Sequence, residues 1–135
     1  MIGILVVTHG RLATELLAAT EHVVGPMEAS RAVCVGPDDD LEKRRAELEA
    51  ALGEVDGGDG VVVVTDMFGG TPANLAVGFM VKGRVEVLAG ANLPMLIKLV
   101  ESRDSMSVAE AAEAARDAGR RYIAVASQAQ AGDAK

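Results

Sequence analysis

His9 and Asp66 are the residues whose types best suit covalent chemistry in this sequence, and each lies at the end of an apolar run. A carboxylate that accepts a hydrogen bond from one imidazole nitrogen fixes the tautomer and leaves the other nitrogen as a nucleophile. Gly10 follows His9, and we expect it to remove side-chain bulk beside the ring. A helical pattern comes next, whose N-terminal amides and partial positive charge suit an anion. These features favour transfer of an anionic group through His9.

A surface histidine at a strand end is the competing interpretation of His9. His22 fits that interpretation in full, because it lies in a helical stretch without an evident partner. Two histidines and the single Cys34, scattered along the chain, do not predict a zinc site. The acidic run Asp38-Asp39-Asp40 is interpreted as the start of a helix rather than as a metal site.

The segment from Asp66 to Asn74 reads DMFGGTPAN and holds the densest cluster of special residues. Gly69 and Gly70 permit backbone angles and close approaches that other residues forbid. Thr71 followed by Pro72 is typical of a helix N-cap and first turn. The segment is either a plain strand-to-helix connection or a group of amides and a hydroxyl facing a phosphoryl group on His9. No GxxxxGK[ST] or GxGxxG pattern follows an apolar run, so we expect no nucleotide site.

Apolar, β-branched runs alternate with helical patterns along the chain, which predicts parallel β-α-β units. The expected strands are Ile2–Thr8, Ala32–Val35, Val61–Thr65 and Val85–Ala89, and the expected helices are Leu12–Val24, Leu41–Leu52 and Pro72–Met80. The fold class is therefore α/β, with a doubly wound, mainly parallel sheet and helices on both faces. If the strand order is 2-1-3-4, as in flavodoxin-like folds, His9 and Asp66 meet at the switch point, where such sheets bind ligands.

The last third of the chain predicts a helix from Asn92 to about Val100, a helix from the capping box at Ser107 to Gly119, and a fifth strand over Tyr122–Ala126. We expect one domain over residues 1–126 and a flexible tail over 127–135. The turn from Ala89 to Pro94 follows a strand that ends at the same edge of the sheet as His9. Phe68, Asn92 and Pro94 are thus candidate residues of the crevice rim, although a turn that serves packing alone is an equal alternative.

Composition restricts the partners of this chain. The formal net charge of −7 argues against nucleic-acid binding, which needs a basic surface, and suits a basic protein partner. The first residues carry no basic segment ahead of their apolar run, which is too short to span a membrane. One cysteine excludes an internal disulfide and fits a reducing compartment. We therefore expect a cytoplasmic protein without direct membrane insertion.

Three motifs together resemble the IIA domain of the mannose family of the phosphoenolpyruvate-dependent sugar phosphotransferase system (PTS). They are VVTHG at residues 6–10, DMFGGTPAN at residues 66–74 and GANLPML at residues 90–96. The similarity extends over about residues 1–126. The resemblance implies that His9 is phosphorylated on Nε2, with Asp66 as its partner.

The same resemblance implies the partners of the reaction. The donor would be the histidine-containing phosphocarrier protein HPr, and the acceptor a IIB protein that phosphorylates sugar during uptake. The resemblance also implies a homodimer in which the last strand, Tyr122–Ala126, lies antiparallel at the sheet edge and is exchanged between subunits. No metal or nucleotide cofactor is expected, because the phosphoryl group arrives on the donor. Gly10, Gly69, Gly70 and Thr71 would contact the phosphoryl group.

Two features depart from the family pattern. Many members continue through a linker into a IIB domain, whereas the sequence ends at Lys135, and Phe68 stands where members often carry Trp. A separate IIB acceptor or a regulatory reading of the phosphorylation state would fit the first departure. The alternatives from other classes are a flavodoxin-like, receiver-type binding module without onward transfer, a dimeric signalling protein, and the phosphocarrier domain that serves dihydroxyacetone kinase. A receiver needs an acidic cluster after its first strand, which Thr8-His9-Gly10 does not supply.

Overall fold

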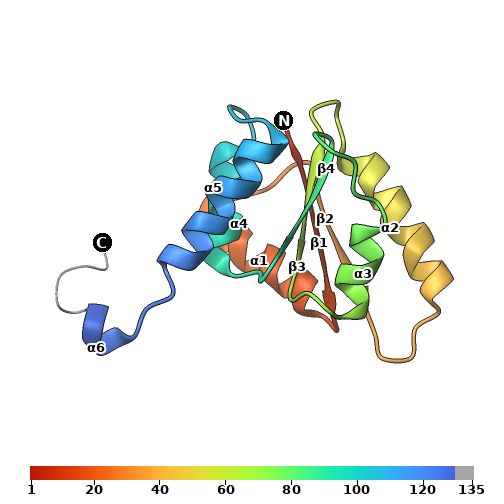
Figure 1. Cartoon of the computed structure of the whole chain (residues 1–135), viewed down its shortest axis with the longest axis horizontal. Coiled ribbons are helices and arrows are strands. Elements are labelled where there is room, and N and C mark those ends of the chain that lie inside the picture. The colour runs from red at the N-terminus through yellow and green to blue at the C-terminus, as the bar shows by residue number, and fades with distance from the viewer. Residues whose placement is uncertain (130–135) are drawn as a thin grey trace.

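Four parallel strands form the centre of the computed structural model, which describes residues 1–129 (Figure 1). Their order is β2-β1-β3-β4, as the sequence predicts. The strands are β1 (Gly3–His9), β2 (Ser30–Val35), β3 (Val61–Thr65) and β4 (Val85–Ala89). The register pairs Val7 of β1 with Thr65 of β3, so these two central strands end side by side.

Helices cover both faces of the sheet, which confirms the doubly wound architecture (Figure 1). The helices are α1 (Leu12–Val24), α2 (Leu41–Val55), α3 (Thr71–Val77), α4 (Leu93–Ser102), α5 (Val108–Arg121) and α6 (Ala126–Ala129). Helices α1, α4 and α5 cover one face, and α2 and α3 cover the other. Within residues 1–129, no helix is both long and apolar enough to cross a bilayer.

The two central strands are buried on both faces, and alternate side chains enter two separate cores. Ile4 and Val6 of β1 pack toward α1, α4 and α5, whereas Leu5 and Val7 pack toward α2 and α3. All of β3 is buried, and His9 is the one exposed residue of β1. Burying an aliphatic side chain of this size contributes about 1.5–3 kcal/mol. The strands thus form a rigid base beneath His9.

Polar side chains begin three of the helices. Asp40 accepts a hydrogen bond from the backbone of Glu42 at the start of α2, and Asn92 accepts one from Met95 at the start of α4. The predicted capping box at the start of α5 is present. Helix α5 does not stop at Gly119, however, but continues to Arg121. A side chain at Gly119 would press against Asn92 and Met95, so this glycine allows α5 to pack closely on α4.

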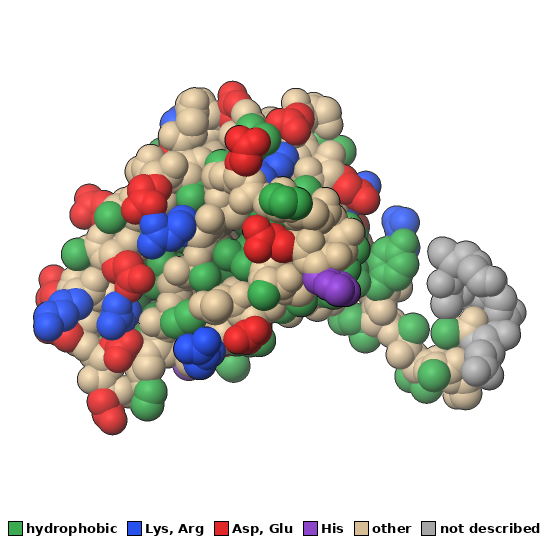
Figure 2. Space-filling view, turned by 180° about the vertical axis from the view of Figure 1, so that it is seen from behind, with side chains coloured by type: hydrophobic (Ala, Val, Ile, Leu, Met, Phe, Trp, Pro, Cys, Tyr) green, Lys and Arg blue, Asp and Glu red, His purple; other side chains and the backbone are tan. Residues whose placement is uncertain are grey.

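The predicted fifth strand over Tyr122–Ala126 is absent from the described chain. Residues 123–125 have no regular structure, and Ala126 begins α6. The apolar pattern is real, but a strand forms only beside a partner strand, and none lies against this segment. The segment instead leaves the body as an arm with apolar side chains (Figures 1 and 2), and Ile123 is 75% exposed. Of the predicted tail, residues 127–129 belong to α6, and residues 130–135 lie outside the described part.

Arg103 fastens the end of α4 to the starts of two strands. It is buried, and its guanidinium donates hydrogen bonds of 2.9 Å to the carbonyl oxygens of Ile2 and Ala29. Burial holds the pKa of Arg103 below its ordinary value, although the nearby carboxylates of Asp104 and Glu28 act in the opposite direction. Arg103 therefore stabilises the fold at the end of the sheet where the strands begin, opposite to the end that carries His9.

Candidate functional site

The ends of β1 and β3 bring His9 and Asp66 together. The two residues are 57 positions apart in the sequence, and they lie just beyond the paired Val7 and Thr65. His9 Nδ1 lies 2.9 Å from Asp66 Oδ2, and the backbone N–H of His9 donates to the same oxygen at 3.1 Å. The predicted meeting of His9 and Asp66 at one end of the sheet is therefore present in the structure.

The Asp66 carboxylate is held by hydrogen bonds on both of its oxygens. Oδ2 accepts from the ring and the backbone of His9, and Oδ1 accepts from the Met67 backbone at 3.1 Å and the Thr65 hydroxyl at 3.3 Å. Its side chain is 15% exposed. Burial acts to raise the pKa of Asp66, but the hydrogen bonds from the His9 ring and backbone outweigh it and hold the pKa below the ordinary value of 3.8. Asp66 therefore stays ionised and fixed in orientation.

The His9 ring has one nitrogen engaged and one available. A carboxylate can only accept, so Nδ1 carries the hydrogen, and Nε2 keeps its lone pair in the neutral ring. The side chain of His9 is 50% exposed, so another protein can reach it. This arrangement provides an oriented nucleophilic nitrogen on the surface, at the carboxyl end of a parallel sheet.

Thr8 and Thr65 directly precede His9 and Asp66 and form hydrogen bonds to them. Neither threonine has a role predicted from the sequence. Both are fully buried. Thr8 accepts a hydrogen bond of 2.6 Å from the Ala13 backbone in α1 and donates one of 3.2 Å to the His9 carbonyl. A threonine directly before each functional residue, at the end of an apolar strand, was the signal available in the sequence. Thr8 thus links the first turn of α1 to His9.

The glycines near His9 act for different reasons. Gly10 has φ +55°, and a Cβ there would meet no atom within 4 Å outside its two chain neighbours, His9 and Arg11. Gly10 is needed for its backbone conformation, which lets the chain turn from β1 into α1. Gly69 likewise has φ +87° with open space around it. Gly70 is the glycine that lies against the ring, because a Cβ there would be 2.6 Å from His9 Cε1 and 2.9 Å from Nε2.

Thr71 begins α3 but does not cap it. The N-cap position is occupied by Gly70, and no side-chain hydrogen bond caps this helix. The predicted capping role of Thr71 is therefore wrong by one residue, because the helix starts a position earlier than the pattern suggests. Pro72 lies in the first turn, as expected. The Thr71 side chain consequently has no part in starting the helix.

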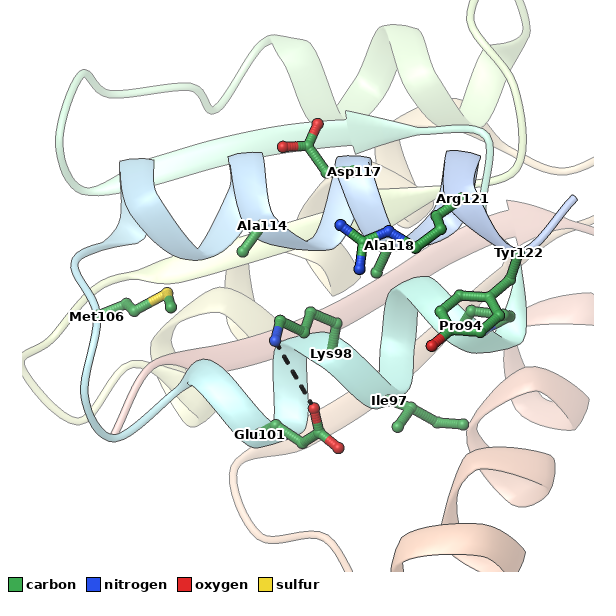
Figure 3. Close-up of a pocket in the computed structure, with 10 residues that line it drawn as sticks. All are labelled: Pro94, Ile97, Lys98, Glu101, Met106, Ala114, Asp117, Ala118, Arg121 and Tyr122. Carbon is green, nitrogen blue, oxygen red and sulfur yellow. Dashed lines mark ion pairs between the residues drawn. The ribbon is translucent and has the colours of Figure 1, made fainter. Parts of the chain in front are cut away.

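The three candidate rim residues are divided between two hollows. Phe68 and Asn92 line a hollow of about 360 Å³ that extends along β4 to Ile123. Pro94 lines a larger groove, of about 650 Å³, between α4 and α5, where Lys98 and Glu101 form an ion pair 4.0 Å long (Figure 3). Phe68 is 63% exposed. Asn92 also serves packing, since its amide donates to the Gly119 carbonyl at 2.9 Å.

The acidic run before α2 has a structural role. Asp40 caps the helix, while Asp39 accepts from the Gly36 backbone and pairs with Arg44 at 2.7 Å. Within residues 1–129, no three His, Cys, Asp or Glu side chains are grouped so that they could hold a metal ion. The acidic cluster that a receiver domain requires is thus not found among these residues.

Comparison with known proteins shows the family to which this chain belongs. The family model described as EIIA-man, PTS system fructose IIA component, matches residues 3–116. The PTS system mannose-specific EIIAB component of Escherichia coli K12 is 35% identical over 104 residues, which are 76% of this chain and 32% of that protein. The chain therefore spans about a third of the length of that relative.

Two solved structures resemble the whole domain. The PTS IIA protein associated with the fucose utilization operon of Streptococcus pneumoniae has a TM-score of 0.82 and 30% identity, covering 94% of this chain and 95% of that one. The phosphotransferase system component EIIA of Streptococcus agalactiae has a TM-score of 0.85 and 25% identity, with 95% and 99% covered. Fold and site define an α/β domain with a histidine–aspartate pair at its switch point. The chain belongs to the mannose-type EIIA family of the sugar phosphotransferase system.

Proposed function

We propose that this protein is a phosphoryl carrier of the sugar phosphotransferase system, which accepts the group on His9 Nε2 and passes it to another protein. The observation that carries the proposal is the hydrogen bond of 2.9 Å between His9 Nδ1 and Asp66 Oδ2. It engages one ring nitrogen and leaves the other free on a half-exposed ring. Family membership supports the same chemistry.

The transfer needs no group beyond the two reacting histidines and their surroundings. The lone pair of neutral His9 Nε2 attacks the phosphorus of a phosphohistidine on the donor. The new N–P bond forms as the donor's N–P bond breaks, and the donor imidazole leaves with the bonding electron pair. The Nδ1 proton of His9 stays on the ring, where Asp66 balances the positive charge that develops. Onward transfer is the same step with His9 as the leaving group.

The charge of the phosphoryl oxygens is balanced by neighbouring backbone and hydroxyl groups in this proposal. Gly70 lies against the Nε2 side of the ring, so the turn of Gly69, Gly70 and Thr71 is the nearest source of such groups. Gly10 follows His9 and precedes Arg11, the N-cap residue of α1. Transfer between two proteins depends mainly on positioning of this kind.

HPr is the proposed donor, and a IIB protein is the proposed acceptor. As a second use, the phosphorylation state of the carrier would serve as a regulatory signal. We propose that the reaction takes place in the cytoplasm. The domain proposed for this work covers residues 1–126. No cofactor is part of the proposal, because the phosphoryl group arrives already bonded to nitrogen.

A homodimer is part of the same proposal. Strand β4 is an edge of the sheet, and the hollow beside it contains Ile123 of the C-terminal arm. Tyr122, Ile123 and Val125 are all more than half exposed in the single chain. An edge strand and an apolar arm are the two elements that a strand exchanged between subunits requires. A dimer mass in sedimentation velocity is the expected result, and a monomer at all concentrations would contradict it.

Intact mass spectrometry after incubation with phosphoenolpyruvate, enzyme I and HPr tests the carrier function. Wild-type protein should gain one phosphoryl group, and that group should be lost in acid, as expected of a phosphorus–nitrogen bond. The variant His9→Ala should gain none. The matched control is His22→Ala, which removes the other histidine, exposed on α1, and should be labelled like wild type.

Two outcomes would contradict this proposal. Labelling of His9→Ala at the wild-type level would show that the phosphoryl group resides elsewhere. Absence of label on wild type would remove the carrier function with this donor and favour a binding module that uses the same crevice. Addition of a IIB protein to the labelled carrier then tests onward transfer directly.

A further inference from the structure

Gly70 lies against the Nε2 side of His9, and its backbone angles do not require a glycine. The N-cap position of α3 that it occupies favours glycine but also suits serine, threonine, asparagine or aspartate. Its φ is −103° and its ψ 168°, which is extended backbone that any residue adopts. Gly69 differs, because its φ of +87° demands glycine for conformational reasons. A glycine at position 70 therefore needs an explanation from its surroundings.

The His9 ring explains why position 70 is a glycine. A Cβ added to Gly70 would lie 2.6 Å from Cε1 and 2.9 Å from Nε2 of His9. Ordinary contact between such atoms requires about 3.5–4.0 Å, so the ring or the turn would have to move by roughly 1 Å. Pro72 Cδ, at 3.7 Å, is the third atom near this position and is not in the way. The whole conflict is thus with the imidazole.

We propose that Gly70 is a positioning residue, whose missing side chain holds open the place in which the His9 ring reaches Asp66 and presents Nε2. The inference rests on the proposed function for its effect on phosphoryl transfer, but not for its effect on the ring. Asp66 fixes the ring from the Nδ1 side, and Gly70 borders it from the Nε2 side. A methyl group at position 70 overlaps the ring at Cε1 and Nε2, so the ring must leave its place beside the carboxylate.

The exposed fractions of the side chains indicate that the ring is the part that moves. The His9 side chain is 50% exposed, whereas Asp66 is 15% exposed and bound through both carboxylate oxygens. The ring is the part that can yield at least cost, because the turn carries the backbone of β3 into α3. In Gly70→Ala the hydrogen bond between Nδ1 and Asp66 is therefore lost, and the ring no longer has one fixed tautomer.

The test measures the ring and the transfer separately. Long-range ¹H–¹⁵N spectra of the ring are recorded in a His22→Ala background, where His9 is the single histidine of the chain. With Gly70 present, the spectra should show one tautomer with the proton on Nδ1. With Gly70→Ala, they should show a mixture, and phosphorylation by HPr should slow by about 100-fold, the loss expected for a misplacement of about 1 Å. Gly57→Ala is the control, because a Cβ there meets nothing within 4 Å and φ is not positive.

Thermal unfolding distinguishes positioning from damage to the fold. Gly70 is the N-cap residue of α3, where alanine is less favourable than glycine, so Gly70→Ala should melt below wild type by no more than about 4 °C, the shift expected for about 1 kcal/mol. An unchanged Nδ1–H tautomer in Gly70→Ala, or transfer within twofold of wild type, would overturn the inference. If wild type takes no phosphoryl group but the ring still changes on Gly70→Ala, the carrier function fails while the positioning role stands.

Discussion

Asp66→Asn is the substitution that best tests how the site works, because the carboxylate receives a backbone N–H on each oxygen. Oδ2 accepts from the His9 backbone and Oδ1 from the Met67 backbone. An asparagine has one carbonyl oxygen and one NH₂ group, so in either orientation the NH₂ group faces one of these two donors. The change therefore leaves one backbone N–H without an acceptor in either orientation of the amide.

The magnitudes follow from this geometry. An unpaired backbone N–H costs about 1–3 kcal/mol when it is buried, and the low end of this range applies here because the hydrogen bonds from His9 and Met67 are exposed. Each kcal/mol corresponds to about 4 °C in Tm in a chain of this size. If the NH₂ group faces His9, the ring turns to the tautomer with the hydrogen on Nε2, which removes the nucleophile. In a hydrolase triad the same change lowers the rate by about 10⁴-fold. We expect phosphorylation of Asp66→Asn to slow by about 10²–10⁴-fold.

The assay is the initial rate of phosphoryl gain from HPr, followed by quenched intact mass spectrometry at protein concentrations equal for all variants. Asp38→Asn is the matched control, since it removes the same charge from an exposed position at the start of the acidic run before α2. It should react like wild type. A rate for Asp66→Asn within twofold of wild type would refute the orienting role of the carboxylate, and the Nδ1 hydrogen bond would then be incidental.

Two further predictions concern stability. Because the pKa of Asp66 in the folded protein lies below its ordinary value of 3.8, the carboxylate stabilises the folded state above that pH, and this contribution is lost as the pH falls through the lowered pKa. The Tm difference between wild type and Asp66→Asn should thus shrink as the pH falls below about 4, and a constant difference would contradict it. Arg103→Leu removes two donors to the carbonyls of Ile2 and Ala29, so urea unfolding should show a loss of about 1–3 kcal/mol, and a loss below about 0.5 kcal/mol would contradict the anchoring role.

The strands could be predicted from the sequence because they depend on local patterns, whereas the strand order that brings His9 and Asp66 together was assumed from flavodoxin-like folds. Val61–Thr65 and Val85–Ala89 are strands with the predicted bounds, since a short β-branched run between turn residues has few other solutions. His9 and Asp66 then meet as a consequence of strand order, with no need to know any side-chain angle. The prediction needed only the strand order, and the structure has that order.

The roles of the glycines could not be predicted, because they depend on which atoms face each position in three dimensions. Gly10 is adjacent to His9 in the sequence, and its φ of +55° is a requirement of the backbone. Gly70 is 61 positions away along the chain, yet its missing side chain would overlap the ring. The end of α5 was misplaced for the same reason, because Gly119 accommodates Asn92 and Met95 rather than ending the helix.

The C-terminal arm shows a different limit. Its apolar residues form a strand pattern, but within residues 1–129 no strand lies against them, so the proposed homodimer would have to supply the partner strand. His9 depends on no such partner. Its orientation comes from Asp66, Thr8 and Gly70, all within one subunit and fixed by the buried ends of β1 and β3. The proposed carrier would react with two different proteins, and it would benefit from this arrangement because the ring is already oriented before either partner arrives.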